Sequence, residues 1–345
     1  MIGRIVADAS PKALAGGIRR RAGRQLSRRA GGPGSDSLVV RQGIMRLLGR
    51  VEADKALQGA ADSAGLRLRK NYGAFFLPFR GGKAKGTVVM FHGYTAGPWQ
   101  YGEMAARFNK AGYHVYAPRL PGHGFMNDAT GRATGERVLK MGQERVYEQF
   151  VKDVYADASS LGAPVFALGL SGGGNAALKM AELTPVKRVV AMAPFLGSNF
   201  PMRLVASTLD LLDRLTFGLF GRLLNRIPKG RNKLASLDIA HPHTQGSIGQ
   251  VLAMRRVGTS VRKLEAPVQF ITTAGDVLSA TGPVGRLFKR SGGAGSGNGW
   301  FHFGADAKVP HAMVSRSQNK APGAVDKIEQ IALDFISRGK ATLAR

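Results

Sequence analysis

The stretch from Pro164 to Met180 constrains the fold more than any other part of the sequence. A short apolar run at 165–170 leads into Gly-Leu-Ser-Gly-Gly at 169–173, and helix-forming residues follow. A sharp strand-to-helix turn strains the backbone of its middle residue, Ser171, and crowds the flanking glycines, which have no Cβ to clash. With 47 glycines in the chain, the pentapeptide alone is also consistent with an ordinary glycine-rich turn. Its strand-turn-helix setting favours a catalytic serine, lifted out at the carboxyl end of a sheet.

Strand-like and helix-like segments alternate along most of the chain. This alternation predicts an α/β fold, in which helices cover both faces of a mostly parallel sheet. We expect strands at 74–80, 87–91, 113–117, 165–170, 189–193, 268–272 and 300–303. We expect helices at 98–111, 137–161, 176–183 and 324–337.

Residues 195–264 interrupt this alternation, because they are far too many for one crossover helix. Their apolar runs predict an inserted helical cap over the carboxyl end of the sheet, between core segments 65–194 and 265–345. The inner face of a cap can both pack and line a pocket. The candidate substrate-pocket residues are Leu209, Leu212, Phe217 and Phe220.

The N-terminal part of the chain differs in composition from the rest. Residues 1–35 are rich in Arg, Gly, Ala and Ser and poor in large apolar residues, which predicts a disordered basic tail. Residues 36–64 carry apolar residues at helical spacing, so we expect a helix that packs on the main domain. A transit peptide is the alternative interpretation of the tail, and a membrane-surface role is the alternative for the helix.

The chain is strongly basic, with 50 Lys and Arg against 22 Asp and Glu, a net charge of +28. Such a field attracts anionic surfaces, so an anionic membrane is a candidate partner of the N-terminus. An Arg-rich composition without a specific partner is the simpler explanation of the charge, and we do not favour nucleic acid. No stretch is long and apolar enough to span a bilayer, and the start lacks the apolar core of a secretory signal. We therefore expect a cytoplasmic location.

The sequence contains no cysteine. This excludes a disulfide framework, a thiolate metal site and a cysteine nucleophile. A serine nucleophile needs a general base and an acid that orients the base, but no metal and no organic cofactor. We therefore expect neither.

The residues for a Ser-acid-His triad occur in the order that this kind of fold uses. Asp276 follows the predicted strand 268–272, and 276 − 171 = 105 residues separate it from Ser171. His311 follows the last predicted strand, 311 − 276 = 35 residues later. We therefore predict that Ser171, Asp276 and His311 are the catalytic residues.

Other acids and histidines compete for these roles. Asp306 is the main rival acid, but it does not directly follow the strand that should carry the acid. His241 and His243 have i, i+2 spacing without a carboxylate cluster, which makes a loop more plausible than a metal site. His302 falls inside a predicted strand, where a packing role is expected.

A tetrahedral intermediate also needs two N–H donors directed at its oxyanion. The backbone N–H of Gly172, directly after Ser171, is one candidate. The other is the backbone N–H of Tyr94, in the loop after the strand that ends at His92-Gly93. We expect His92 to stabilise this loop and not to act as a base.

Three motifs in order resemble the α/β-hydrolase superfamily. They are His92-Gly93-Tyr94, Pro118-Arg-Leu-Pro-Gly-His-Gly124 and Gly169-Leu-Ser-Gly-Gly-Gly174. The chain is most similar to the monoacylglycerol lipase, carboxylesterase and serine-aminopeptidase-like branch, over roughly residues 70–340. The resemblance implies the same triad, the same two N–H donors, a helical cap at 195–264 and a structural role for His123.

These observations favour a serine hydrolase that cleaves a carboxylic ester through an acyl-enzyme on Ser171. The apolar cap segment favours an apolar ester or a lipid over a sugar or a nucleotide as substrate. A peptidase or an acyltransferase would use the same triad. The alternative from another class is a non-catalytic basic protein that binds an anionic surface or nucleic acid.

Overall fold

The computed structural model describes residues 38–130, 134–197, 202–227, 247–276 and 278–344. The predicted basic tail, residues 1–35, lies outside the described residues. The described strands form an eight-stranded sheet, in the order β10-β9-β8-β7-β6-β3-β4-β2, and a separate pair, β1-β5. The large sheet consists of β2 (Phe75–Leu77), β3 (Thr87–Phe91), β4 (His114–Ala117), β6 (Val165–Leu170), β7 (Val189–Met192), β8 (Val268–Thr273), β9 (Gly299–Phe303) and β10 (Leu343–Ala344).

Every strand pair of the large sheet is parallel except β2 with β4. A parallel sheet is stable only when both faces are covered, and β3 shows how this sequence meets that need. Val89 and Phe91 pack into the core on one face, and Val88 and Met90 pack into the core on the other. This fold class is the one predicted from the alternation of strands and helices.

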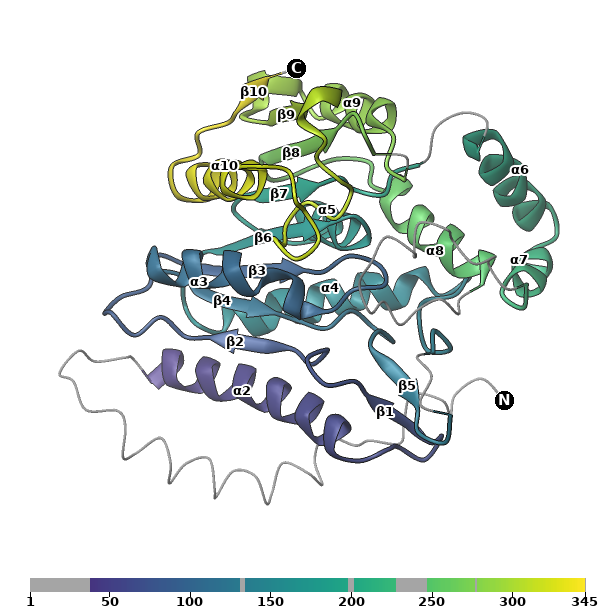
Figure 1. The fold of residues 1–345 in the computed structure, drawn as a ribbon, viewed down its shortest axis with the longest axis horizontal. Coiled ribbons are helices and arrows are strands. Elements are labelled where there is room, and N and C mark those ends of the chain that lie inside the picture. The colour runs from purple at the N-terminus through teal and green to yellow at the C-terminus, as the bar shows by residue number, and fades with distance from the viewer. Residues whose placement is uncertain (1–37, 131–133, 198–201, 228–246, 277, 345) are drawn as a thin grey trace. The chain divides into compact units, whose positions relative to one another are not determined.

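The helices divide between the two faces (Figure 1). One face is covered by α3 (Gly102–Lys110) and α10 (Ala324–Arg338), which lie in front of the sheet. The other is covered by α2 (Leu38–Gly59), α4 (Glu144–Ser159), α5 (Gly172–Leu183) and α9 (Thr281–Arg290). Buried side chains recur along α10 at the spacing of one helical face, from Val325 to Ile336. Burial of each large apolar side chain contributes about 1.5–3 kcal/mol.

The N-terminal helix α2 is joined to the domain by buried carboxylates. Asp157 of α4 accepts from Arg50 Nε at 2.9 Å and also pairs with Arg46. In the other direction, Asp54 of α2 accepts from Arg119 in the loop after β4, at 2.7 and 3.1 Å. These contacts join α2 both to α4 and to the loop that contains His123.

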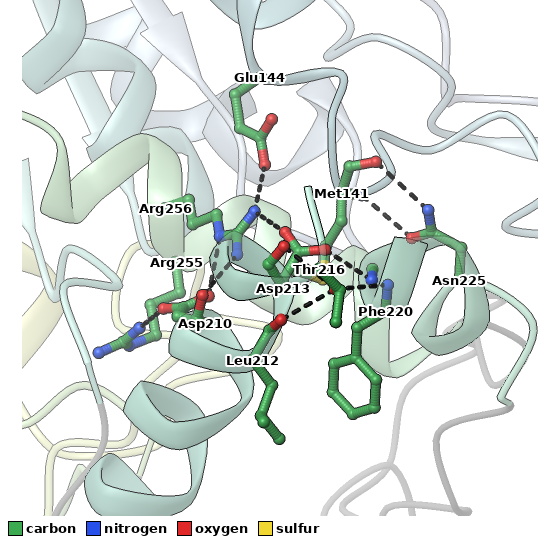
Figure 2. A network of polar contacts seen from close by, with 11 residues as sticks. Met141, Glu144, Asp210, Leu212, Asp213, Thr216, Phe220, Asn225, Arg255 and Arg256 are labelled. Atoms are coloured by element: carbon green, nitrogen blue, oxygen red, sulfur yellow. Dashed lines mark hydrogen bonds and ion pairs between the residues drawn. The ribbon is translucent and has the colours of Figure 1, made fainter. Parts of the chain in front are cut away.

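Between β7 and β8 the described residues form α6 (Met202–Leu215), α7 (Leu219–Leu224) and α8 (Ile248–Thr259). The helix α8 packs on α4 and α5 through buried residues such as Leu252 and Val257. Ion pairs join α6 to α8, as Figure 2 shows. Arg256 Nε donates to Asp210 at 2.8 Å, and its Nη1 pairs with Asp213 at 2.7 Å. The carboxylates of α6 therefore face the domain.

Several elements differ from the sequence-based expectation. The helix expected at 137–161 begins only at Glu144, and α5 begins at Gly172 instead of 176. The small sheet of β1 (Leu66–Leu68) and β5 (Phe125–Asn127) was not predicted, nor was α9. The glycine-rich run 291–299 contains a 3-10 turn, and the buried Asn298 side chain bonds to Val268 N–H and the Ser291 carbonyl.

Candidate active site

Ser171 lies between β6 and α5 in a strained backbone conformation. Its φ is 55° and its ψ is −117°, a combination that non-glycine residues rarely adopt. The Ser171 N–H donates to the Met192 carbonyl at 2.9 Å, and the Ser171 carbonyl accepts from Asn175 N–H at 3.1 Å. These bonds hold the strained residue between the ends of two parallel strands.

Gly169 and Gly173 are needed for close approach and not for a positive φ. A Cβ on Gly169 would lie 2.0 Å from the Gly173 carbonyl oxygen, and a Cβ on Gly173 would lie 2.0 Å from the Phe91 carbonyl oxygen. Neither residue has a positive φ. The first turn of α5 thus lies directly against the end of β3, which brings residues 91–94 beside the serine.

Asp276 and His311 are in contact. Oδ2 of Asp276 lies 2.7 Å from His311 Nδ1, and its Oδ1 accepts from the N–H groups of Leu278 and Ser279 at 2.8 and 2.9 Å. The Asp276 side chain is 1% exposed and that of His311 is 21% exposed. Because Nδ1 faces the carboxylate, Nε2 is the nitrogen available to take a proton.

The three residues that the sequence proposes as a triad lie at the carboxyl ends of strands in the same sheet. Within the described part of the chain, no hydrogen bond joins Ser171 Oγ to the His311 ring. Catalytic hydrogen bonds are often long without substrate and shorten when it binds. The arrangement therefore contains a histidine oriented by a buried carboxylate and a strained serine, without a hydrogen bond between the two in the described part of the chain.

The competing acid and histidines occupy other places. Asp306 is exposed in the 3-10 turn Ala305–Ala307. His302 lies in β9, where Nδ1 is 2.9 Å from Thr272 Oγ1, and burial lowers its pKa. His241 and His243 lie outside the described residues.

The loop of residues 92–97, here the β3–α3 loop, carries the Tyr94 N–H. His92 is fully buried, and its Nε2 accepts from Leu120 N–H at 3.0 Å. Its Nδ1 therefore carries the proton and donates to the Gly93 carbonyl at 2.9 Å. That carbonyl belongs to the same peptide group as the Tyr94 N–H, and a trans peptide directs the two in opposite directions. His92 thus fixes the direction of the proposed oxyanion donor.

The Tyr94 side chain connects the same loop to the inserted segment. Its hydroxyl lies 3.4 Å from Gln250 Oε1, and its ring stacks edge-on with His123 at 5.6 Å. Burial raises the pKa of the Tyr94 hydroxyl far above its usual value, so the group stays neutral. Gln250 in turn donates to the carbonyls of Gly135 and Val138 at 2.6 and 3.2 Å.

The helix α8 also packs against the turn around Ser171, a contact that the sequence did not predict. A Cβ on Gly172 would lie 3.0 Å from Met254 Sδ. The fully buried Asn175 donates to the carbonyls of Met254 and Phe195 at 2.8 and 3.0 Å. A polar residue in the otherwise apolar start of a helix was the sequence signal for this contact.

The predicted pocket residues do not all face inward. Leu209 and Phe220 are partly buried against the core. Leu212 is 39% exposed and Phe217 is 96% exposed, so these two side chains do not pack against the core, and their role as pocket residues stays a prediction. The reason is that Asp210 and Asp213 occupy the inner side of α6, and Phe217 has a left-handed φ of 50° at the turn into α7.

Within the ranges given above, no group of three or more His, Asp or Glu side chains could hold a metal ion. Among the same residues, no helix has the length and apolarity required to cross a bilayer.

Solved structures with the same fold include several lipolytic enzymes. A monoglyceride lipase from Saccharomyces cerevisiae aligns with a TM-score of 0.57 at 14% identity, over 82% of this chain and 94% of that one. A monoacylglycerol lipase from Paleococcus ferrophilus gives 0.52 at 20% identity, over 77% and 99%. A structure described under LipS and LipT, two metagenome-derived lipolytic enzymes, gives 0.53 at 15% identity, over 78% and 99%.

Sequence comparisons define the family. A comparison with curated proteins gives no match. The family profile described as "Serine aminopeptidase, S33" (Hydrolase_4) matches residues 82–297, which is more than half of the chain and includes both Ser171 and Asp276. The fold, with its mostly parallel sheet and its lipase-like structural neighbours, agrees with this match. The chain therefore belongs to the S33 serine aminopeptidase family within the α/β-hydrolase superfamily.

Proposed function

We propose that this protein is a serine hydrolase that cleaves a carboxylic ester through an acyl-enzyme on Ser171. Ser171 Oγ attacks the ester carbonyl carbon while His311 Nε2 takes the hydroxyl proton. The C–O bond to the alcohol breaks, and His311 returns the proton to the leaving alkoxide. Water then attacks the acyl-enzyme with His311 as base again, which releases the acid and restores the Ser171 hydroxyl.

The observation that carries this proposal is the Asp276–His311 pair. The carboxylate is buried and is held by two backbone N–H groups on one oxygen, so its other oxygen faces Nδ1 in a fixed direction. An imidazole oriented in this way stabilises the imidazolium that forms when Nε2 takes a proton. The N–H groups of Gly172 and Tyr94 are the proposed oxyanion donors. The first lies in the opening turn of α5, where helix N–H groups have no intrahelical acceptor.

An apolar substrate is supported by the outward face of α6 and α7. Leu204, Leu211, Leu215, Phe217, Leu219 and Leu223 are all more than half exposed. The acids of α6 point inward to Arg255 and Arg256, whereas Arg214, Arg222 and Arg226 are exposed. An apolar face flanked by exposed cations fits the surface of an anionic lipid aggregate. We therefore propose an ester that is presented in such a phase, with the acyl chain held near Leu209 and Phe220.

The test is turnover of p-nitrophenyl esters of graded acyl length by the wild type and by Ser171→Ala. We expect hydrolysis that rises with chain length by up to about fourfold per methylene, because burial of a CH₂ contributes about 0.8 kcal/mol. Ser171→Ala should lower kcat by about 10⁴-fold or more with an unchanged melting temperature. Aminopeptidase substrates assayed in parallel distinguish a peptidase from an esterase. An absence of turnover with every substrate would contradict the enzyme assignment.

A further inference from the structure

We propose that Gln100 is a positioning residue that joins the β3–α3 loop to the loop that follows His311, an inference that rests on the proposed function. Gln100 lies in the 3-10 turn Pro98–Tyr101 and is 4% exposed. Its Oε1 accepts from Gly93 N–H at 2.9 Å, and its Nε2 donates to Gln318 Oε1 at 2.8 Å. A backbone N–H can only donate, so it must face the amide oxygen, and the orientation of the carboxamide follows.

On one side, Gln100 completes the support of the two peptide groups that flank Gly93. The first peptide group is held at Gly93 N–H by Gln100. The second is held at the Gly93 carbonyl by His92 Nδ1 at 2.9 Å and by Ala96 N–H at 3.0 Å. This second group carries the Tyr94 N–H. Without Gln100 the buried Gly93 N–H would lose its acceptor, and the peptide group that it belongs to would lose this hydrogen bond.

On the other side, Gln318 belongs to the segment that begins with His311, residues 311–323, here called the 311–323 loop. Internal hydrogen bonds hold this loop together. Met313 N–H donates to the His311 carbonyl at 2.9 Å, and Asn319 Nδ2 donates to the Met313 carbonyl at 3.0 Å. The N–H groups of Gln318 and Asn319 both donate to the Ser315 carbonyl, at 2.9 and 2.8 Å. A movement of Gln318 would therefore be transmitted toward the proposed base.

The two loops follow different strands, β3 and β9, so their relative position depends on contacts between them. The reaction requires the oxyanion donor and the base to face the same carbonyl group. A misplacement of about 1 Å can lower the rate by about 10²-fold. Glutamine suits this junction because one buried side chain supplies both an acceptor for Gly93 and a donor for Gln318.

The test compares Gln100→Met, Gln318→Met and Gln318→Glu, each in the full chain. Gln269→Met is the matched control, because Gln269 is equally buried and also accepts from one backbone N–H, that of Thr342 at 2.8 Å. It lies near the start of β8, away from the carboxyl end that carries Asp276. The measurements are kcat, KM, the melting temperature and amide hydrogen exchange.

We expect Gln100→Met to lower kcat by about 10- to 100-fold, with KM within about twofold, because only the transition state uses the oxyanion donor. Gln318→Met should have a smaller effect in the same direction. Gln318→Glu should remain near wild type, since a carboxylate still accepts from Gln100. The Gln100→Met, Gln318→Met double variant should have the same kcat as Gln100→Met alone, because both substitutions remove the same Gln100–Gln318 hydrogen bond. Gln269→Met should lower the melting temperature without lowering kcat.

The inference is overturned if Gln269→Met lowers kcat as much as Gln100→Met, if Gln318→Glu behaves like Gln318→Met, or if the two losses simply add. Hydrogen exchange separates this inference from the proposed function. If the wild type hydrolyses no ester, the proposed function fails, and hydrogen exchange still tests whether Gln100 couples the β3–α3 loop to the 311–323 loop. Faster exchange in both residues 92–97 and 311–323 of Gln100→Met, but not of Gln269→Met, would support the coupling. Unchanged exchange in the 311–323 loop would contradict it.

Discussion

Replacement of Gly173 by alanine tests the geometry of the turn around Ser171, between β6 and α5. The added Cβ would lie 2.0 Å from the Phe91 carbonyl oxygen and 2.4 Å from that of His92. Carbon and carbonyl oxygen approach each other to about 3.3 Å at closest, so the start of α5 and the end of β3 must separate by about 1.3 Å. Both obstructing atoms are backbone, so no side-chain rotation relieves the contact. Overpacking of this kind costs about 3 kcal/mol of folding free energy. The same displacement moves Ser171 away from the Tyr94 N–H, which lowers kcat/KM by at least about 10²-fold.

Two further substitutions calibrate this prediction. In Gly174→Ala the nearest atom is Pro194 Cα at 3.0 Å, so a shift of a few tenths of an ångström is enough, and a loss below about tenfold is expected. In Gly49→Ala the Cβ meets nothing within 4 Å in the middle of α2, so stability should rise by about 0.5–1 kcal/mol. The assays are hydrolysis of a short p-nitrophenyl ester and thermal unfolding. Wild-type kcat/KM in Gly173→Ala, or equal losses at 173 and 174, would mean that close contact between the start of α5 and the end of β3 does not position Ser171.

Three other predictions concern the acid, the ion pairs of α6 and its apolar face. Asp276→Asn should lower kcat by about 10⁴-fold and Asp306→Asn by less than about twofold in the same ester assay, and the reverse order would identify Asp306 as the acid. Arg256→Met should accelerate hydrogen exchange in α6 and α7 while α5 stays protected, because the substitution leaves the buried Asp213 carboxylate without its cation. Arg316→Met is the control: Arg316 is exposed, and loss of its pairs with Glu103 and Asp326 should change hydrogen exchange little. Phe217→Ser should weaken co-sedimentation with phosphatidylglycerol vesicles by at least about fivefold, whereas Val146→Ser, at an exposed apolar residue of α4, should not; equal binding of the two variants would remove the lipid-facing role of α6 and α7.

The parts of the molecule that sequence predicted are those set by local patterns. The strand, turn and helix around Ser171 are contiguous, and the need for glycine at 169 follows from the turn itself, whereas the need at 173 arises from the adjacent end of β3. Buried parallel strands such as 165–170 are continuous apolar runs, so the fold class was accessible. Asp276 could be placed because it directly follows such a run.

The parts that sequence did not predict depend on distant partners. The α9 segment contains two glycines and a proline, and its helical conformation depends on packing of Val284 and Leu287 into the core. The apolar pattern of α6 predicts an amphipathic helix but not which side faces the domain. That choice is made by Asp210 and Asp213 meeting Arg255 and Arg256, about 45 residues later in the chain. The Gln100–Gln318 bond likewise joins residues 218 positions apart.

Covalent labelling tests whether Ser171 is the nucleophile. The protein is treated with a fluorophosphonate, which reacts with activated serines, and the modified peptide is located by mass spectrometry. We predict stoichiometric modification of the peptide that contains Ser171, loss of ester hydrolysis in step with labelling, and no modification of Ser171→Ala. Labelling at another serine, or full ester turnover in an enzyme that Ser171 modification has saturated, would show that Ser171 is not the nucleophile.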